Sequence, residues 1–192
     1  MSKSSLPTTA FAVLGLLSLR DTSGYELAAF ADESLAYFWP MHRSLVYREL
    51  RQLEDGGYIV GTAVAQERVP DKRVYRLTER GRAALDEWLA TPGFQPPRVR
   101  SEFLVKFFFA RRLGHEQRWA LLREYRAAVE LDLADLQATA DRLNDLPEGA
   151  FWRLAALHGV RTRRALLQWI ADVEQALAAM PDTAEATQEV DQ

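Results

Sequence analysis

Two neighbouring segments of this chain have the pattern of β-strands, while the rest of its patterned sequence is helical. The segments are YIVGTAVAQ (residues 58–66) and RVYRLT (residues 73–78), and both are rich in β-branched and aromatic residues. Pro70 and Asp71 lie between them and are typical of a turn. We therefore expect one β-hairpin, and its place among the helices decides which folds are open to the chain.

Helical patterns lie on both sides of this hairpin. Ser23 and Glu26 match the Ser-x-x-Glu capping box at a helix start. Pro40 suits the first turn of the helix that precedes the hairpin, and Gly56 and Gly57 end that helix. The patterns predict helices over residues 8–18, 24–33, 41–55 and 79–90. Three helices, a hairpin and a fourth helix, in this order, predict a winged helix-turn-helix domain (α-α-α-β-β-α), whose third helix enters the major groove of DNA.

The third predicted helix has two distinct faces. At 100° per residue its apolar side chains, Val46, Leu50 and Leu53, fall on one face and predict contact with the core. The opposite face and the helix start hold polar and basic residues that can contact base edges and phosphates. These candidates for DNA contact are His42, Arg43, Ser44, Tyr47, Arg48 and Arg51.

The hairpin is also basic near its tip. Arg68, Lys72 and Arg73 are well placed to contact phosphates flanking the bases that the third helix meets, whereas strand alternation turns Arg76 outward. Basic residues on such surfaces are often only solvated, and some winged helices bind proteins instead of DNA. Because a protein-binding hairpin has less need of a basic tip beside a basic helix, the sequence favours DNA.

Beyond the break TPGFQPP (residues 91–97) every pattern is helical. A short apolar helix, SEFLVKFFFARRLG, precedes two long ones over residues 116–143 and 149–180. Apolar residues recur in the first long helix at heptad-like spacing, interrupted by Arg126. We expect a homodimer interface that includes Phe107, Phe108, Leu122, Val129, Leu133, Leu136 and Trp169. The same aromatic residues can form a helical core, which is compatible with an interface, and a further alternative is a pocket for an aromatic small-molecule effector.

The predicted organisation is a mainly α chain with two domains. Residues 1–92 form the winged helix-turn-helix domain, residues 93–181 the long-helix dimerisation domain, and residues 182–192 a polar, disordered tail. The basic cluster RTRRA (residues 161–165) either extends the DNA surface or, as we favour, is solvated or paired with acidic residues of the 116–143 helix.

Composition excludes several other classes of protein. The net charge of −3 means that any nucleic-acid site is a local patch. The chain has no cysteine, and His42, His115 and His158 lack metal-ligand spacing, so we expect no metal site and no cofactor. It contains neither a Gly-rich phosphate loop nor a Gly-x-Ser-x-Gly motif, which argues against an enzyme. No signal peptide or membrane-spanning apolar run is present, and we expect a cytoplasmic protein.

Several motifs of this chain resemble the PadR family of bacterial transcriptional regulators. AFAVLGLLSL followed by SGYELAAF is similar to the family's opening helix and Gly-Tyr-Glu-Leu element. Tyr47, Leu50, Leu53, Glu54 and Gly57 match its Tyr-x-x-Leu-x-x-Leu-Glu-x-x-Gly pattern, and RVYRLTERGRAALDEWL resembles its wing strand and Leu-Thr-x-x-Gly helix.

The chain departs from the PadR pattern at Arg43-Ser44, where many relatives have Gly or Ser-Gly. Its second half resembles the subfamily of virulence-gene regulators with an extended helical C-terminal domain. The resemblance implies a homodimer that binds double-stranded DNA at a pseudo-palindromic operator and usually represses transcription.

Overall fold

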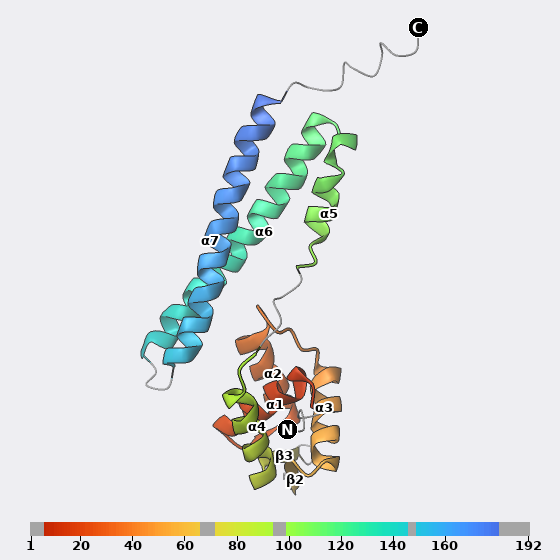
Figure 1. Cartoon of the computed structure of the whole chain (residues 1–192), viewed down its shortest axis with the longest axis vertical. Helices are drawn as coiled ribbons and strands as arrows, with labels where there is room; N and C mark the ends of the chain where they lie inside the picture. Colours follow the sequence, from red (N-terminus) through yellow and green to blue (C-terminus); the bar gives the residue numbers. More distant parts are fainter. Residues whose placement is uncertain (1–5, 66–71, 94–98, 146–148, 181–192) are drawn as a thin grey trace. The chain divides into compact units, whose positions relative to one another are not determined.

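The computed structural model describes residues 6–65, 72–93, 99–145 and 149–180, arranged in two compact units, Met1–Pro96 and Pro97–Gln192 (Figure 1). The first unit contains α1 (Thr8–Leu19), β1 (Thr22–Ser23), α2 (Gly24–Leu35), α3 (Arg43–Asp55), β2 (Ile59–Val64), β3 (Lys72–Leu77) and α4 (Glu79–Ala90). The second contains α5 (Glu102–Phe108), η1 (Ala110–Arg112), α6 (His115–Arg142), η2 (Leu143–Asp145) and α7 (Ala150–Ala179). The predicted turn at Pro70-Asp71 and the predicted tail lie outside the described residues.

The core of the first unit forms around α1. This helix is apolar on nearly every side, and its side chains at Phe11, Val13 and Leu14 are almost fully buried. The ring of Trp88 from α4 stacks on Phe11, with ring centroids 4.7 Å apart. Since α2, α3, α4 and β3 all contact α1, the helix occupies the centre of the unit.

The sheet has three antiparallel strands in the order β1-β3-β2. The predicted hairpin is present as β2 and β3, and we call this hairpin the wing. β1 was not predicted from the sequence. Its two residues, Thr22 and Ser23, pair with Tyr75 and Val74, and two residues are too few to leave a strand period. The helix and strand order confirms the predicted winged helix-turn-helix fold.

The predicted start of α3 was wrong by two residues. The helix begins at Arg43 with His42 as its N-cap, and the amides of Leu45 and Val46 donate to the His42 carbonyl oxygen. Pro40 therefore lies in the connector and not in the first helical turn. The next residue, Met41, buries its side chain in the core, which fixes where the connector ends.

Thr78 and Gly81 join α4 to the sheet. The Thr78 hydroxyl accepts a hydrogen bond from the Gly81 amide at 3.1 Å and donates to the backbone carbonyls at Gly57 or Tyr58, 2.8 and 3.0 Å away. A methyl group on Gly81 would overlap the carbonyl oxygen of Tyr58. The Leu-Thr-x-x-Gly motif thus encodes a helix cap and a close approach between α4 and Tyr58, the residue just before β2.

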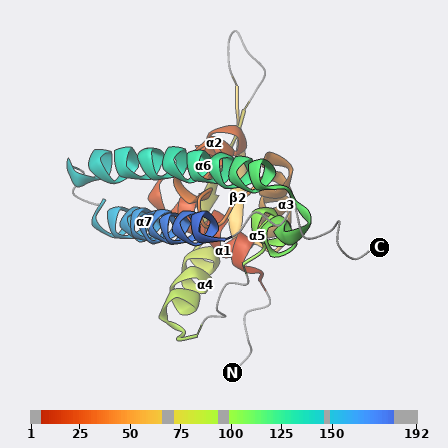
Figure 2. The ribbon, with the colours of Figure 1, turned by 90° about the horizontal axis from the view of Figure 1, so that it is seen from above.

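In the second unit α6 and α7 lie side by side along their length (Figures 1 and 2). Leu122, Val129 and Ile170 are buried between them. The Arg126 that interrupts the heptad-like pattern forms a two-point ion pair with Glu174 of α7, at 3.0 and 2.6 Å. This bidentate geometry lets a charged side chain occupy an otherwise apolar seam.

One arginine of the basic cluster at residues 161–165 is paired as we favoured. Arg163 lies 3.2 Å from Asp132 of α6, whereas Arg161 and Arg164 are exposed. Among the described residues we find no helix with both the length and the apolar character that a bilayer crossing needs.

The contact between α4 and Tyr58 predicts that Gly81→Ala lowers the free energy of unfolding by about 1–3 kcal/mol, because the added methyl group forces the backbone apart. Urea unfolding of the full-length chain measures this change. Gly15→Ala is the matched control, since a methyl group there meets no atom within 4 Å beyond its own helix and chain neighbours. Equal stability of the two variants would contradict the proposed close contact.

Candidate nucleic-acid interface

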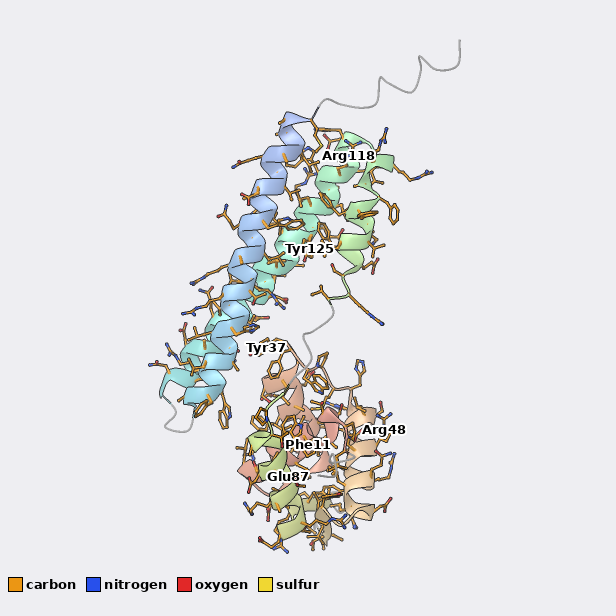
Figure 3. All side chains as sticks on the ribbon, in the orientation of Figure 1. Phe11, Tyr37, Arg48, Glu87, Arg118 and Tyr125 are labelled. Carbon is orange, nitrogen blue, oxygen red and sulfur yellow. The ribbon has the colours of Figure 1, made fainter. Side chains whose placement is uncertain are left out.

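The exposed face of α3 is fixed by the side chains on its opposite face. Val46, Leu50 and Leu53 are fully buried, as predicted. Ser44, Tyr47, Arg48 and Arg51 consequently lie on the exposed side of the helix. Figure 3 shows Arg48 projecting outward from α3, away from the other helices of its unit. The helix therefore presents a polar and basic surface of the kind that can enter a DNA groove.

The start of α3 adds two exposed cationic or ionisable side chains. His42 is the N-cap residue but its side chain makes no capping hydrogen bond. The Arg43 guanidinium lies over the ring of Tyr25 from α2, 5.0 Å from the ring centroid, which is cation–π geometry. This contact holds the Arg43 side chain against the ring of Tyr25.

Tyr47 packs against the start of α2. A methyl group on Gly24 would lie 2.7 Å from Cε1 of the tyrosine ring, so the glycine allows the ring to approach the α2 backbone. The side chain stays partly exposed on the same surface as Arg48. Its position is thus determined by the packing of α2 against α3.

Arg48 is linked to a buried carboxylate. Its Nη2 lies 3.1 Å from Oε1 of Glu49, which is 2% exposed, while the Arg48 side chain is 58% exposed. A guanidinium has five N–H donors, so one contact leaves the others available. Arg48 can therefore keep this ion pair and still bind a base edge or a phosphate.

The wing cations Lys72 and Arg73 are both paired with carboxylates of the neighbouring helices. Lys72 Nζ lies 3.5 Å from Glu26 of α2, and Arg73 Nη2 lies 2.5 Å from Glu54 of α3. Arg68, the third predicted wing contact, lies outside the described residues. The sequence analysis did not anticipate either ion pair, because the partners are 46 and 19 residues apart along the chain.

Both carboxylates are also bound by other groups. Hydrogen bonds from the Ser23 amide and hydroxyl, with a smaller effect of the Lys72 charge, lower the pKa of Glu26 from 4.5 to about 2. The side-chain hydrogen bond from Arg73, followed by the hydrogen bond from the Gly61 amide, lowers the pKa of Glu54. Glu54 in turn raises the pKa of Arg73. With these lowered pKa values, both carboxylates are ionised at neutral pH and can pair with the wing cations.

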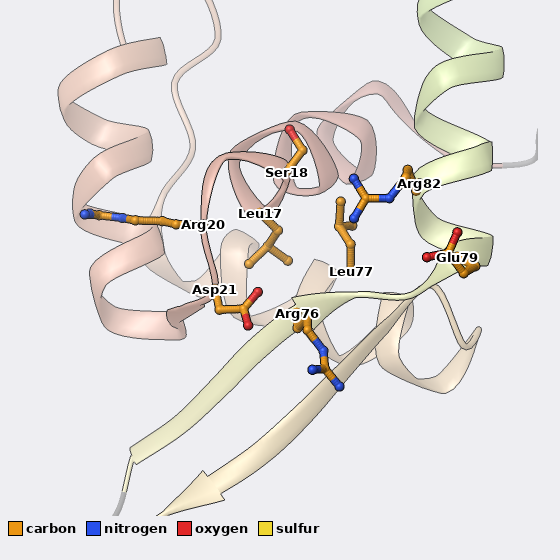
Figure 4. A pocket seen from close by; sticks show the side chains of 8 residues that line it. All are labelled: Leu17, Ser18, Arg20, Asp21, Arg76, Leu77, Glu79 and Arg82. Carbon is orange, nitrogen blue, oxygen red and sulfur yellow. The ribbon is translucent and has the colours of Figure 1, made fainter. Parts of the chain in front are cut away.

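Arg76 lies on the opposite face of β3 from Arg73, as strand alternation predicts. It borders a depression of about 410 Å³ between the end of α1, β3 and the start of α4 (Figure 4). The polar residues around this depression are Ser18, Arg20, Asp21, Arg76, Glu79 and Arg82, with both signs of charge. Arg76 therefore faces away from Arg73, on the side of β3 that strand alternation also gives to Lys72.

Most residues predicted for dimerisation are buried or partly buried within their own chain. Leu122, Val129 and Leu136 are buried, Leu133 is partly buried, and Phe107 and Trp169 join an aromatic cluster with Phe103. Phe103 also stacks on Tyr125, with ring centroids 3.7 Å apart. These rings pack on one another, which supports the interpretation of a helical core.

Phe108 differs from the other predicted dimerisation residues because it is 81% exposed. Leu104 and Val105 are exposed on the same face of α5, four and three residues before it. Among the described residues of this unit, the other exposed large apolar side chains are Val99, Phe109, Leu131, Phe151, Leu154 and Met180. Of this set the sequence analysis named only Phe108 for the interface, because an apolar residue has the same pattern whether its own chain or a partner covers it.

The fold and the basic surface of its third helix define a winged helix-turn-helix protein. Residues 13–87 match the model of the transcriptional regulator PadR-like family, and residues 99–178 match the model named Virulence activator alpha C-term. The chain belongs to the PadR-like family of transcriptional regulators. The resemblance inferred from the sequence motifs is thereby confirmed.

Relatives support the same assignment. The negative transcriptional regulator PadR of Bacillus subtilis is 32% identical over 133 residues, covering 69% of this chain and 73% of the relative. A crystal structure of Bacillus subtilis PadR with operator DNA matches with a TM-score of 0.80 and 26% identity, covering 89% and 99% of the two chains. The Vibrio cholerae virulence activator AphA matches with a TM-score of 0.68 and 27% identity, covering 90% and 99%.

The lowered pKa of Glu26 predicts a pH-dependent contribution to stability. Because the folded-state pKa lies below the ordinary value of 4.5, this contribution is present above about pH 4.5 and is lost as the pH falls toward 2. Glu26→Gln should therefore be less stable than the unmodified chain at pH 6, and the difference should shrink between pH 4.5 and 2. Urea unfolding at a series of pH values measures it. A stability difference between the two proteins that stays constant down to pH 2 would contradict the lowered pKa of Glu26.

Proposed function

We propose that this chain is a homodimeric transcriptional repressor that binds a pseudo-palindromic operator through α3 and the wing. The observation that supports this most directly is the exposed basic face of α3, next to which the start of β3 supplies two further cations. A relative with the same fold has been crystallised with operator DNA. A protein-binding winged helix would not need cations on both elements.

The two surfaces have different roles in this proposal. Arg48 and Arg51 lie on the part of α3 that enters the major groove, where arginine pairs with guanine edges or with phosphates. Ser44 and Tyr47 complete this surface, and His42 and Arg43 contact DNA at the helix start. Lys72, Arg73 and Arg68 of the wing contact flanking phosphates, which adds affinity without sequence preference.

We propose repression as the sign of regulation. The Bacillus subtilis relative is named a negative regulator, and a dimer bound across a promoter blocks polymerase sterically. The Vibrio cholerae relative is named an activator, so the position of the operator relative to the promoter decides the sign. In this role the chain is a cytoplasmic regulator and not an enzyme.

We assign a different role to each of the two domains. Residues 1–92 contact DNA and residues 93–181 hold the dimer together. We assign the dimer contact to the exposed apolar face of α5, Leu104, Val105 and Phe108, with other exposed apolar side chains of the second unit. Exposed aromatic residues are unfavourable in water and are typical anchors of protein interfaces.

A small aromatic acid is the effector class to test first. Bacillus subtilis PadR has been crystallised with p-coumaric acid, and that structure matches this chain with a TM-score of 0.74 and 25% identity. Titration of the purified protein with p-coumaric acid, followed by tryptophan fluorescence and by operator affinity, tests whether a compound of this class releases the DNA.

Selection from a randomised duplex library tests the DNA proposal. The bound duplexes are sequenced, and the affinity of the enriched duplex is then followed against salt. We expect an inverted repeat, and an association constant that falls by about 0.9 in log units per log unit of salt for each phosphate contact. No enrichment and no salt dependence would instead support a winged helix that binds a protein.

Arg48→Ala should change which sequences are enriched and weaken operator binding by about 1–3 kcal/mol, if Arg48 contacts a base edge. Competition binding with operator variants, each altered at one base pair, measures both effects. Arg82→Ala is the matched control, because it removes the same charge from the surface of α4, next to the depression. An unchanged sequence preference for Arg48→Ala would contradict the proposed base contact.

Phe108→Ser should weaken the dimer. In a two-fold symmetric interface each substitution acts twice, so a loss of about 1 kcal/mol per copy raises the dissociation constant roughly 30-fold. Sedimentation equilibrium measures the constant, with Gln175→Ser at an exposed polar position of α7 as the control. A dissociation constant equal to that of the control would contradict the assignment of α5 to the dimer interface.

A further inference from the structure

The wing leaves the core of its unit halfway along its length. Near its base Ile59, Tyr75 and Leu77 are buried. Farther out, Thr62, Ala63 and Val64 of β2 are exposed on both faces of the strand. Hydrogen bonds between β2 and β3 hold the two strands to each other, but they do not fix the direction of the hairpin relative to α3.

Glu54 makes a direct link between the recognition helix and this part of the wing. Its Oε1 accepts a hydrogen bond from the Gly61 amide at 2.9 Å and pairs with Arg73 Nη2 at 2.5 Å. Gly61 belongs to β2 and Arg73 to β3, and Gly61 pairs with Tyr75 in the ladder. One carboxylate oxygen from the last turn of α3 thus contacts both strands. We call these two contacts the Glu54 bridge.

Gly61 is the residue that gives the Glu54 bridge its space. A methyl group at this position would overlap Nε of Arg73 and lie 2.8 Å from Oε1 of Glu54. Both of these atoms are at the ends of flexible side chains, so Gly61→Ala would displace them without a backbone clash. This substitution therefore disturbs the Glu54 bridge and leaves every charge in place.

We propose that Glu54 is a positioning residue for DNA binding, which holds the wing and Arg73 at a fixed distance from the recognition helix through the Glu54 bridge. This inference rests on the proposed function. In this proposal Glu54 itself does not contact DNA. It acts through Arg73, whose side chain is half exposed and keeps further N–H donors for a phosphate.

Positioning and simple charge repulsion predict opposite effects when Glu54 is neutralised. A carboxylate near DNA repels phosphates, so removing its charge should by itself tighten binding. If Glu54 instead fixes Arg73, removing its charge loosens this pairing and weakens binding, because the ordering of Arg73 must then be supplied on association. The direction of the change separates the two explanations.

The test compares three variants for binding to the duplex enriched by the unmodified protein. Glu54→Gln should weaken binding at least tenfold, and Gly61→Ala should weaken it similarly with no change of charge. Asp55→Asn is the matched control, since it removes one negative charge from the adjacent exposed position of α3, and it should bind as tightly as the unmodified protein or more tightly.

Two further measurements distinguish positioning from general loss of structure. Glu54→Gln should lower the salt slope by about one phosphate contact, whereas Asp55→Asn should leave it unchanged. In a chain that already carries Arg73→Gln, Glu54→Gln should cause no further loss, because it acts through the missing arginine. Far-ultraviolet circular dichroism and thermal unfolding check that each variant is folded. If Glu54→Gln is not folded, the DNA affinity of Gly61→Ala provides the test instead.

The outcomes separate this inference from the proposed function. If the unmodified protein enriches no duplex, the proposed function and this inference fail together. If it enriches an operator and Glu54→Gln binds as tightly as Asp55→Asn, only the positioning role is overturned. An additive loss in the Arg73→Gln background would likewise show that Glu54 does not act through Arg73.

Discussion

Val46, Leu50 and Leu53 on the inner face of α3 determine what the rest of that helix presents to solvent. All three are fully buried in a core centred on α1, so the helix cannot rotate about its axis without exposing them. Helix geometry then places Arg48, Arg51, Tyr47 and Ser44 on the opposite side. The basic surface is therefore a consequence of apolar burial, and the ion pairs with the wing add to an orientation that the core has already fixed.

The elements that the sequence predicted well have strong local patterns. The capping box of Ser23 and Glu26 is present in full, with both hydrogen bonds, and α4 spans the predicted residues 79–90. The faces of α3 follow directly from its period. Local patterns were insufficient at the start of α3, where Met41 is buried in the connector although Pro40 favours a helix start there. They were also insufficient at β1, whose two residues pair with a strand about fifty positions later in the chain.

The ion pairs could not be predicted because they depend on tertiary distance. Glu54 belongs to a recognised motif, yet its spacing says nothing about Arg73 or Gly61, which reach it only when the wing folds against α3. Arg126 likewise interrupts the apolar spacing of α6 for a reason that the sequence does not reveal. In the structure its guanidinium pairs with Glu174 of α7. In the second unit the seam residues are covered by α7, whereas Phe108 is exposed.

Chemical-shift mapping of backbone amides, with the enriched duplex added to the isotope-labelled protein, tests most directly whether α3 and the wing form one DNA-binding surface. The account predicts that the largest shifts fall on His42 and residues 43–51 of α3, and on β2 and β3 near Gly61 and Arg73, with α4 little changed. Shifts confined to α4 and the depression beside Arg76 and Arg82, with α3 unaffected, would contradict it.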